Sequence, residues 1–97
     1  MIAQNPLIAF IPTKDAARAR LFYEEQLGLR FVSDDSFAVV MDANGIMVRV
    51  VRVGEFTPAS FTILGWQVED IHRTVAEMTG KGSQFKRYSF LEQGDFI

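Results

Sequence analysis

The hydrophobic and polar positions change period several times over the first 53 residues, and each change predicts a new element. Short apolar runs of strand length alternate with polar turns, whereas one early segment has apolar residues three and four apart, as an amphipathic helix does. Between the last two apolar runs, Asn44-Gly45 is a dipeptide typical of a tight β-hairpin. The predicted elements are a strand at residues 7–11, a helix at 16–27, and strands at 29–32, 37–41 and 46–53.

The remaining residues show a similar order of patterns after a linker that contains Pro58. An aspartate precedes each predicted helix, Asp15 in the first half and Asp70 in the second, and its carboxylate can accept hydrogen bonds from the free N–H groups of the first turn. Glycine follows each helix, at Gly28 and again within residues 80–82, as is common at helix ends. The second half is therefore predicted to contain a strand at 61–68, a helix from 71, and a strand at 84–88.

The two halves align as an internal repeat. Placing Ile8 on Ile63 brings Asp15 onto Asp70 without a gap. The matched positions fall in a strand, at a helix start, at a helix end and in the next strand, which predicts a β-α-β-β-β unit in each half. Chance similarity between two strand-helix-strand segments is the alternative explanation. The other matched pairs are Arg18 with Arg73, Gly28 with Gly82, and Phe31 with Phe85.

The second unit is predicted to be incomplete, because only one clear strand follows its helix. An unfinished sheet exposes a strand edge, and exposed edges pair readily with other strands. Two explanations are open: the sequence lacks a tail that belongs to it, or another subunit completes the sheet.

Length and composition restrict the classes of function. The chain of 97 residues suffices for one small domain, and 48% hydrophobic residues allow it a core. A net charge of −2 with interspersed signs argues against a nucleic-acid partner, which would require a basic face. The chain has no cysteine, no apolar run near the roughly 20 residues of a membrane-spanning helix, and no signal-peptide pattern. We therefore expect a cytoplasmic protein without disulfides, thiolate metal sites or a membrane partner.

Three segments resemble the vicinal oxygen chelate superfamily, which comprises glyoxalases, bleomycin-resistance proteins and extradiol dioxygenases. They are the Asp-capped helix with Phe22-Tyr23, the following Leu27-Gly28-Leu29, and the later stretch at residues 64–70. The resemblance implies an α+β fold, in which paired βαβββ modules form one curved, mixed, cup-like sheet with helices on its outer face. A single domain would span residues 1–97, with module one at about 6–53 and module two at about 60–97, truncated at the C-terminus. It also implies a homodimer, in which exchange of a strand or a module would complete the sheet.

The metal-ligand positions of the superfamily, carried onto this sequence, hold no metal ligands. Ile8 and Ile63 occupy the first-strand positions at which metal-using members have histidine or glutamate, and Arg49 occupies the last-strand position of module one. The equivalent position of module two lies beyond the last residue. Aliphatic side chains cannot coordinate a cation and a guanidinium repels one, so we predict no metal and no cofactor.

Arg49 is the main polar candidate for binding a ligand. Strand alternation places it on the face of Met47 and Val51, and the resemblance places that face inside the cup. A guanidinium there could bind a carboxylate or a phosphate, and an arginine at the sheet edge or in a salt bridge is the alternative. The residues predicted to bind the ligand are Arg49, Gln67, Ile8, Phe10, Met47 and Ile63.

Other conspicuous residues have structural interpretations. Trp66 shares the parity of neighbouring apolar residues and is predicted to lie in the core. The one histidine, His72, is predicted on the surface of a helix, and Arg52 on the outer face of the sheet. The Asp34-Asp35 pair is predicted to lie in a solvated turn and not to form a carboxylate dyad.

These observations predict a metal-independent small-molecule-binding protein, with an aromatic or amphipathic ligand in the cup, as in the bleomycin-resistance branch. No nucleophile elbow, phosphate-binding glycine loop or Cys/His cluster occurs in the sequence, so no catalytic residue is assigned. The alternative is an enzyme of the superfamily (a lyase, an isomerase or a dioxygenase) with an atypical site.

Overall fold

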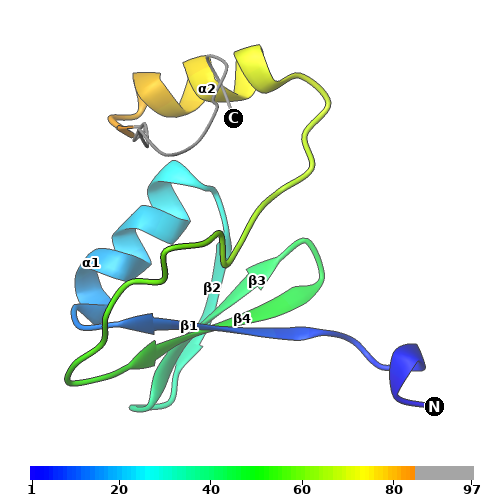
Figure 1. Cartoon of the computed structure of the whole chain (residues 1–97), viewed down its shortest axis with the longest axis vertical. Coiled ribbons are helices and arrows are strands. Elements are labelled where there is room, and N and C mark those ends of the chain that lie inside the picture. The colour runs from blue at the N-terminus through cyan, green and yellow to red at the C-terminus, as the bar shows by residue number, and fades with distance from the viewer. Residues whose placement is uncertain (85–97) are drawn as a thin grey trace. The chain divides into compact units, whose positions relative to one another are not determined.

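The computed structural model describes residues 1–84 of the chain, and these residues have an α+β fold. They contain one open four-stranded mixed sheet and two α-helices (Figure 1). The chain divides into two compact units, Met1–Pro58 and Ala59–Ile97, and the sheet belongs entirely to the first.

The five elements predicted for the first half are all present in the first unit. The strands lie in the order β1-β4-β3-β2, with β1 parallel to β4 and the other neighbours antiparallel. A short 3-10 helix, η1, precedes them at Ile2–Gln4. The elements that follow are β1 (Ile8–Thr13), α1 (Ala16–Leu21) with its π-helical continuation η2 (Phe22–Gln26), β2 (Arg30–Asp34), β3 (Ala38–Ala43) and β4 (Ile46–Arg52).

Local contacts explain where these elements begin and end. An Oδ1 atom of Asp15 accepts a hydrogen bond of 3.1 Å from the backbone N–H of Arg18, which caps α1 as predicted. Gly28 has a φ of +74° and separates η2 from β2. The β3–β4 hairpin turns at Asn44 and Gly45, whose φ values of 52° and 91° are those that a tight hairpin needs.

The core lies on the face of the sheet that α1 covers (Figure 1). Alternate residues of the two central strands point into it, among them Met41 and Val50, which are both 0% exposed. Burial of such side chains is the main force that holds a helix against a sheet. The core side chains from the strands on this face are Ile11, Val39, Met41, Val48 and Val50.

The second unit contains α2 (Ile71–Gly80), which begins as predicted. An Oδ1 atom of Asp70 accepts a hydrogen bond of 3.1 Å from the backbone N–H of Arg73, as Asp15 does at α1. After the helix, Gly82 has a φ of +99°. The two halves therefore share the helix cap on which their alignment rests.

The strand predicted at residues 61–68 is not formed, and this prediction is wrong. A strand needs a neighbour to bond its backbone, and no backbone hydrogen bond joins this segment to a strand within residues 1–84. Trp66, predicted to lie in the core, is 49% exposed, because without a sheet no face exists for it to bury. The strand predicted at 84–88 falls almost wholly outside the described residues.

Candidate functional site

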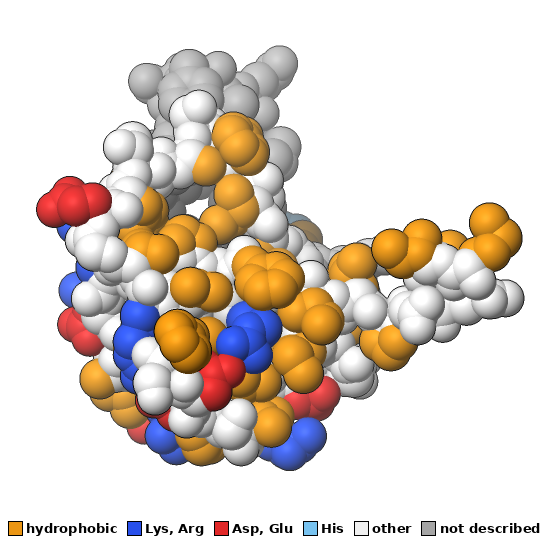
Figure 2. All heavy atoms as spheres, turned by 90° about the horizontal axis from the view of Figure 1, so that it is seen from below, with side chains coloured by type: hydrophobic (Ala, Val, Ile, Leu, Met, Phe, Trp, Pro, Cys, Tyr) orange, Lys and Arg blue, Asp and Glu red, His pale blue; other side chains and the backbone are white. Residues whose placement is uncertain are grey.

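The face of the sheet opposite α1 carries exposed apolar side chains in the first unit. Register places Ile8 and Phe10 of β1 directly beside Met47 and Arg49 of β4 on this face. Phe10 is 65% exposed, unlike any residue of the core. Figure 2 views the molecule from below relative to Figure 1, and shows hydrophobic side chains gathered among acidic and basic ones on this face. We call this surface the open face.

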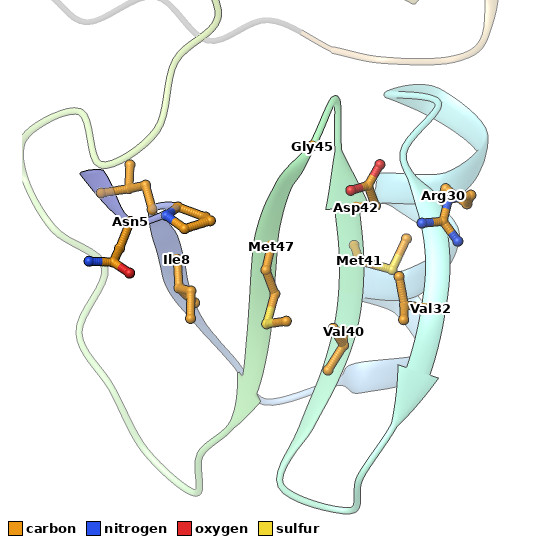
Figure 3. Close-up of a pocket in the computed structure, with 11 residues that line it drawn as sticks. Asn5, Ile8, Arg30, Val32, Val40, Met41, Asp42, Gly45 and Met47 are labelled. Carbon is orange, nitrogen blue, oxygen red and sulfur yellow. The ribbon is translucent and has the colours of Figure 1, made fainter. Parts of the chain in front are cut away.

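A hollow of about 550 Å³ lies at one end of the open face, next to the β3–β4 turn (Figure 3). Its volume falls within the range of about 300–1,000 Å³ that small-molecule sites usually have. All of its lining residues belong to the first unit. They are Asn5, Pro6, Leu7, Ile8, Arg30, Val32, Val40, Met41, Asp42, Gly45 and Met47.

The apolar part of the hollow comes from all four strands. Val40 of β3, at 4% exposed, supplies buried surface in the middle of the sheet, and Met47 of β4 and then Ile8 of β1 follow on one side of it (Figure 3). Val32 joins them from β2, where the register shifts between Phe31 and Ser33. Such a bulge adds one residue to a strand and redirects its side chain, which explains how Val32 reaches the hollow.

Two opposite charges, Arg30 and Asp42, lie at the rim of the hollow (Figure 3). They are direct partners in the β2–β3 register. Within residues 1–84, neither side chain forms a hydrogen bond or an ion pair. Both groups are therefore available to a ligand bound beside them.

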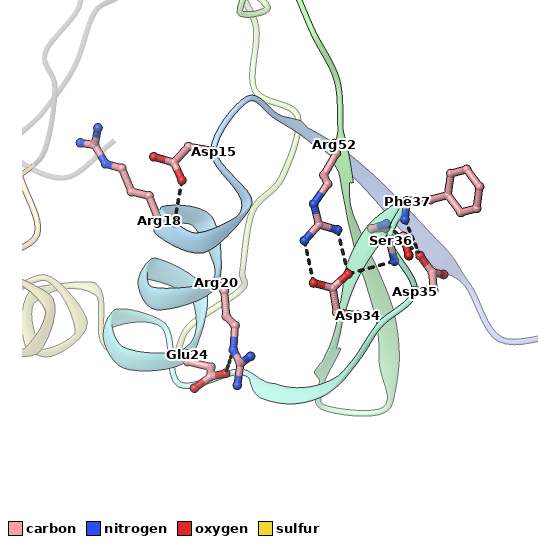
Figure 4. Close-up of polar contacts among 10 residues, drawn as sticks. Asp15, Arg18, Arg20, Glu24, Asp34, Asp35, Ser36, Phe37 and Arg52 are labelled. Carbon is pink, nitrogen blue, oxygen red and sulfur yellow. Dashed lines mark hydrogen bonds and ion pairs between the residues drawn. The ribbon is translucent and has the colours of Figure 1, made fainter.

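At the opposite end of the sheet, two carboxylates are fully engaged by arginines of β4. Both oxygens of Asp34 accept hydrogen bonds from Arg52, at 2.7 and 2.6 Å, and Asp35 accepts one of 2.6 Å from Arg49. Figure 4 shows the Asp34–Arg52 pair together with the turn at Ser36. Within residues 1–84, both guanidinium groups are thus paired with carboxylates of this turn.

The ion pairs lower the pKa values of both carboxyl groups. The hydrogen bond from Arg52 lowers the pKa of Asp34 from 3.8 to about 2, with help from the backbone N–H of Ser36. The hydrogen bond from Arg49 likewise lowers the pKa of Asp35, and the backbone N–H groups of Ala38 and Phe37 add to the effect. In the same way, Asp34 raises the pKa of Arg52. Asp34 and Asp35 are exposed, as predicted, and each is in addition paired with an arginine.

The structure brings together only part of the predicted site. Ile8 and Met47 line the hollow, whereas Phe10 lies on the same face but outside the lining. Arg49 has the predicted parity, but its guanidinium pairs with Asp35, which matches the salt-bridge alternative.

The two other predicted ligand-binding residues, Gln67 and Ile63, are exposed and belong to the second unit. His72 is exposed on α2, as predicted. Arg52 also has the predicted parity, opposite to Arg49, because it shares the face of Val48 and Val50.

The sequence interpretation missed Arg30, Asp42, Val32 and Val40. The Asn-Gly hairpin fixes the β3–β4 register, and so could have placed Val40 and Asp42 on the face of Met47. Arg30 and Val32 could not have been placed in this way, because the bulge interrupts the alternation of β2.

Residues 1–84 contain no group of three or more His, Asp or Glu side chains that could hold a metal ion. In the same part of the chain, no helix combines the length and apolar character needed to cross a bilayer.

Comparisons with known proteins concern the fold. No protein-family model and no curated protein matches the chain. A solved structure from the mobile metagenome of V. Pseudocholerae is similar, with a TM-score of 0.62 and 16% identity over 94% of this chain and 77% of that one. An integron cassette protein of V. Cholerae gives a TM-score of 0.60 and 16% identity, with the same coverage. At this identity the similarity establishes the fold alone.

Proposed function

We propose that this protein is a metal-independent small-molecule-binding protein that holds its ligand in the hollow of the open face. The observation that carries this proposal is a hollow of about 550 Å³ with apolar walls and, at its rim, two charges that form no ion pair within residues 1–84. An apolar surface with a few polar groups is the usual composition of a ligand site. The paired-module fold of the glyoxalase, bleomycin-resistance and dioxygenase superfamily is part of the same proposal, supported by the repeated Asp caps.

Binding is favoured over catalysis by the side chains that line the hollow. None of them is a serine, threonine, cysteine, lysine or histidine, so the lining offers no hydroxyl, thiol, amine or imidazole, and the carboxylate of Asp42 is its one candidate nucleophile or base. Arg30, Asn5 and Asp42 are suited to fixing the orientation of a ligand by charge and hydrogen bonding.

Filling the hollow should abolish binding. We expect wild type to bind the neutral apolar dye 1-N-phenylnaphthylamine with saturable fluorescence enhancement, and Met47→Trp to lose it, because a large ring at this position occupies the space. The matched control is Phe10→Trp, which adds an indole to the same face outside the lining. Equal dye binding by both variants, or no saturable binding by wild type, would contradict the proposal.

We also propose that the chain forms a homodimer, by exchange of a strand or a module between subunits. Among residues 1–84, the edge strands β1 and β2 each pair with a neighbour on one side only, and Phe10 on β1 is largely exposed. Light scattering at micromolar concentration should give twice the chain mass of 11.0 kDa. A mass equal to that of one chain at all concentrations would exclude the dimer.

A further inference from the structure

The pairing of charges differs sharply within the first unit. Arg20, Arg49 and Arg52 each form an ion pair with a carboxylate. Arg30 and Asp42 stand directly opposite each other on adjacent strands, where opposite charges normally attract, yet form no ion pair. Each therefore keeps its hydrogen-bonding capacity for another molecule.

The two charges also lie at the distance that one small ligand can span. Directly opposed residues of an antiparallel pair have Cα atoms about 4.5–5.5 Å apart, so their side chains can reach groups on neighbouring atoms of a ligand. Arg30 presents a fork of N–H donors suited to a carboxylate, and Asp42 presents acceptor oxygens suited to an ammonium group. The apolar side chains of Val40 and Met47 line the same hollow as both charges.

A ligand with a single charge fits this rim poorly. An anion would meet the carboxylate of Asp42, a cation would meet the guanidinium of Arg30, and a neutral molecule would leave both without partners. A ligand that carries both charges satisfies both side chains at once. We infer that the hollow takes a zwitterionic small molecule with an apolar body, of which an apolar α-amino acid is the simplest example. This inference rests on the proposed small-molecule site.

The test uses L-phenylalanine and three derivatives, titrated into the full chain by isothermal calorimetry. N-acetyl-L-phenylalanine retains only the carboxylate, L-phenylalaninamide retains only the ammonium group, and N-acetyl-L-phenylalaninamide retains neither. Because a hydrogen bond to a charged group contributes about 1.5–3 kcal/mol, we expect affinity to fall about 10-fold or more for each charge removed.

Two variants assign each charge to its partner. Arg30→Gln should make L-phenylalanine and L-phenylalaninamide bind alike, because the carboxylate then has no cationic partner. Asp42→Asn should make L-phenylalanine and its N-acetyl derivative bind alike. The matched control is Arg52→Gln, which removes an arginine at the other end of the sheet and should leave the order of the four ligands unchanged. Thermal unfolding of each variant checks that it is folded.

The outcomes separate this inference from the site on which it rests. Equal affinity of wild type for all four compounds, or binding of the apolar dye without binding of any of the four, overturns the zwitterion assignment alone. Failure of both the dye and the four compounds to bind overturns the proposed site as well. An unchanged ligand order in both Arg30→Gln and Asp42→Asn overturns the assigned roles of these residues.

Discussion

At one end of the sheet, Asp34 and Asp35 each form an ion pair with an arginine of β4. At the other end, Arg30 and Asp42 are opposite each other in the register but form no ion pair. The first end has a turn whose carboxylates also bond backbone N–H groups, so its charges stabilise the chain itself. The second end has a hollow beside its charges. The difference shows that the identity of a charged residue says little about its role until its partner is known.

Substitutions in the turns at the two ends of the sheet are expected to change the free energy of unfolding most. Gly45, beside the hollow, has a φ of +91° with nothing near its missing side chain, so Gly45→Ala introduces strain without a clash. A left-handed backbone costs a residue with a Cβ roughly 1–2 kcal/mol, and we expect the free energy of unfolding in urea to fall by about that amount.

Ser36, at the ion-paired end, is the counterpart, because it adopts a φ of 73° with a Cβ present. Ser36→Gly should relieve the same strain, partly offset by the greater freedom of glycine in the unfolded chain, and raise the free energy of unfolding by roughly 0.5 kcal/mol. Destabilisation by both substitutions would show that backbone strain does not govern these turns.

Acid should reduce the stability that the ion pair of Asp34 with Arg52 contributes to the fold. The pKa of Asp34 falls from 3.8 to about 2 on folding, so its ionised form favours the folded state. This contribution is fully present above pH 3.8 and is lost as the pH falls through about 2. Melting temperatures measured between pH 7 and pH 2 should show wild type above Asp34→Asn at neutral pH, with the gap closing in acid.

The partner variant sharpens this measurement. Arg52→Gln removes the hydrogen bonds that lower the pKa of Asp34. Its melting temperature should therefore also lie below that of wild type at neutral pH, and this gap should also close in acid. A gap that stays constant from pH 7 to pH 2 in both variants would contradict the linkage.

The smallest effect on stability is expected from the substitution of Arg30. Arg30→Gln breaks no ion pair within residues 1–84, whereas Arg52→Gln breaks a two-hydrogen-bond pair that is partly exposed. We expect urea midpoints to fall less for Arg30→Gln than for Arg52→Gln, and salt to reduce the difference, because exposed ion pairs are screened. An equal or larger loss at Arg30 would mean that this residue stabilises the fold.

The sequence allowed prediction of the elements whose signals are local. Asp15, Asp70 and Asn44-Gly45 act within one turn of chain, and each occupies the predicted place in the structure. The segment at 61–68 has a strand-like composition, but a strand also requires a partner that composition cannot supply. Trp66 was misplaced for the same reason.

The candidate site was predictable only in part. Met47 was predicted from its alternation with Arg49 along one strand, and Ile8 from the first-strand position that the superfamily resemblance implies; both line the hollow. Arg49 had the predicted parity, but its pairing with Asp35 depends on a contact between residues 14 positions apart, which periodicity does not reveal. Arg30 depends on the irregularity in β2, and no propensity marks where a bulge will form.

The bulge in β2 has a consequence for the evolution of this protein. Val32 is the extra residue, because Phe31 and Ser33 on either side of it pair with the consecutive residues Met41 and Val40 of β3. The rest of β2 therefore pairs with β3 as a regular strand without Val32 would. Deleting this one codon would preserve both charge arrangements and enlarge the cavity by one side chain. The apolar lining of the hollow and the charges at its rim can therefore change independently in this scaffold.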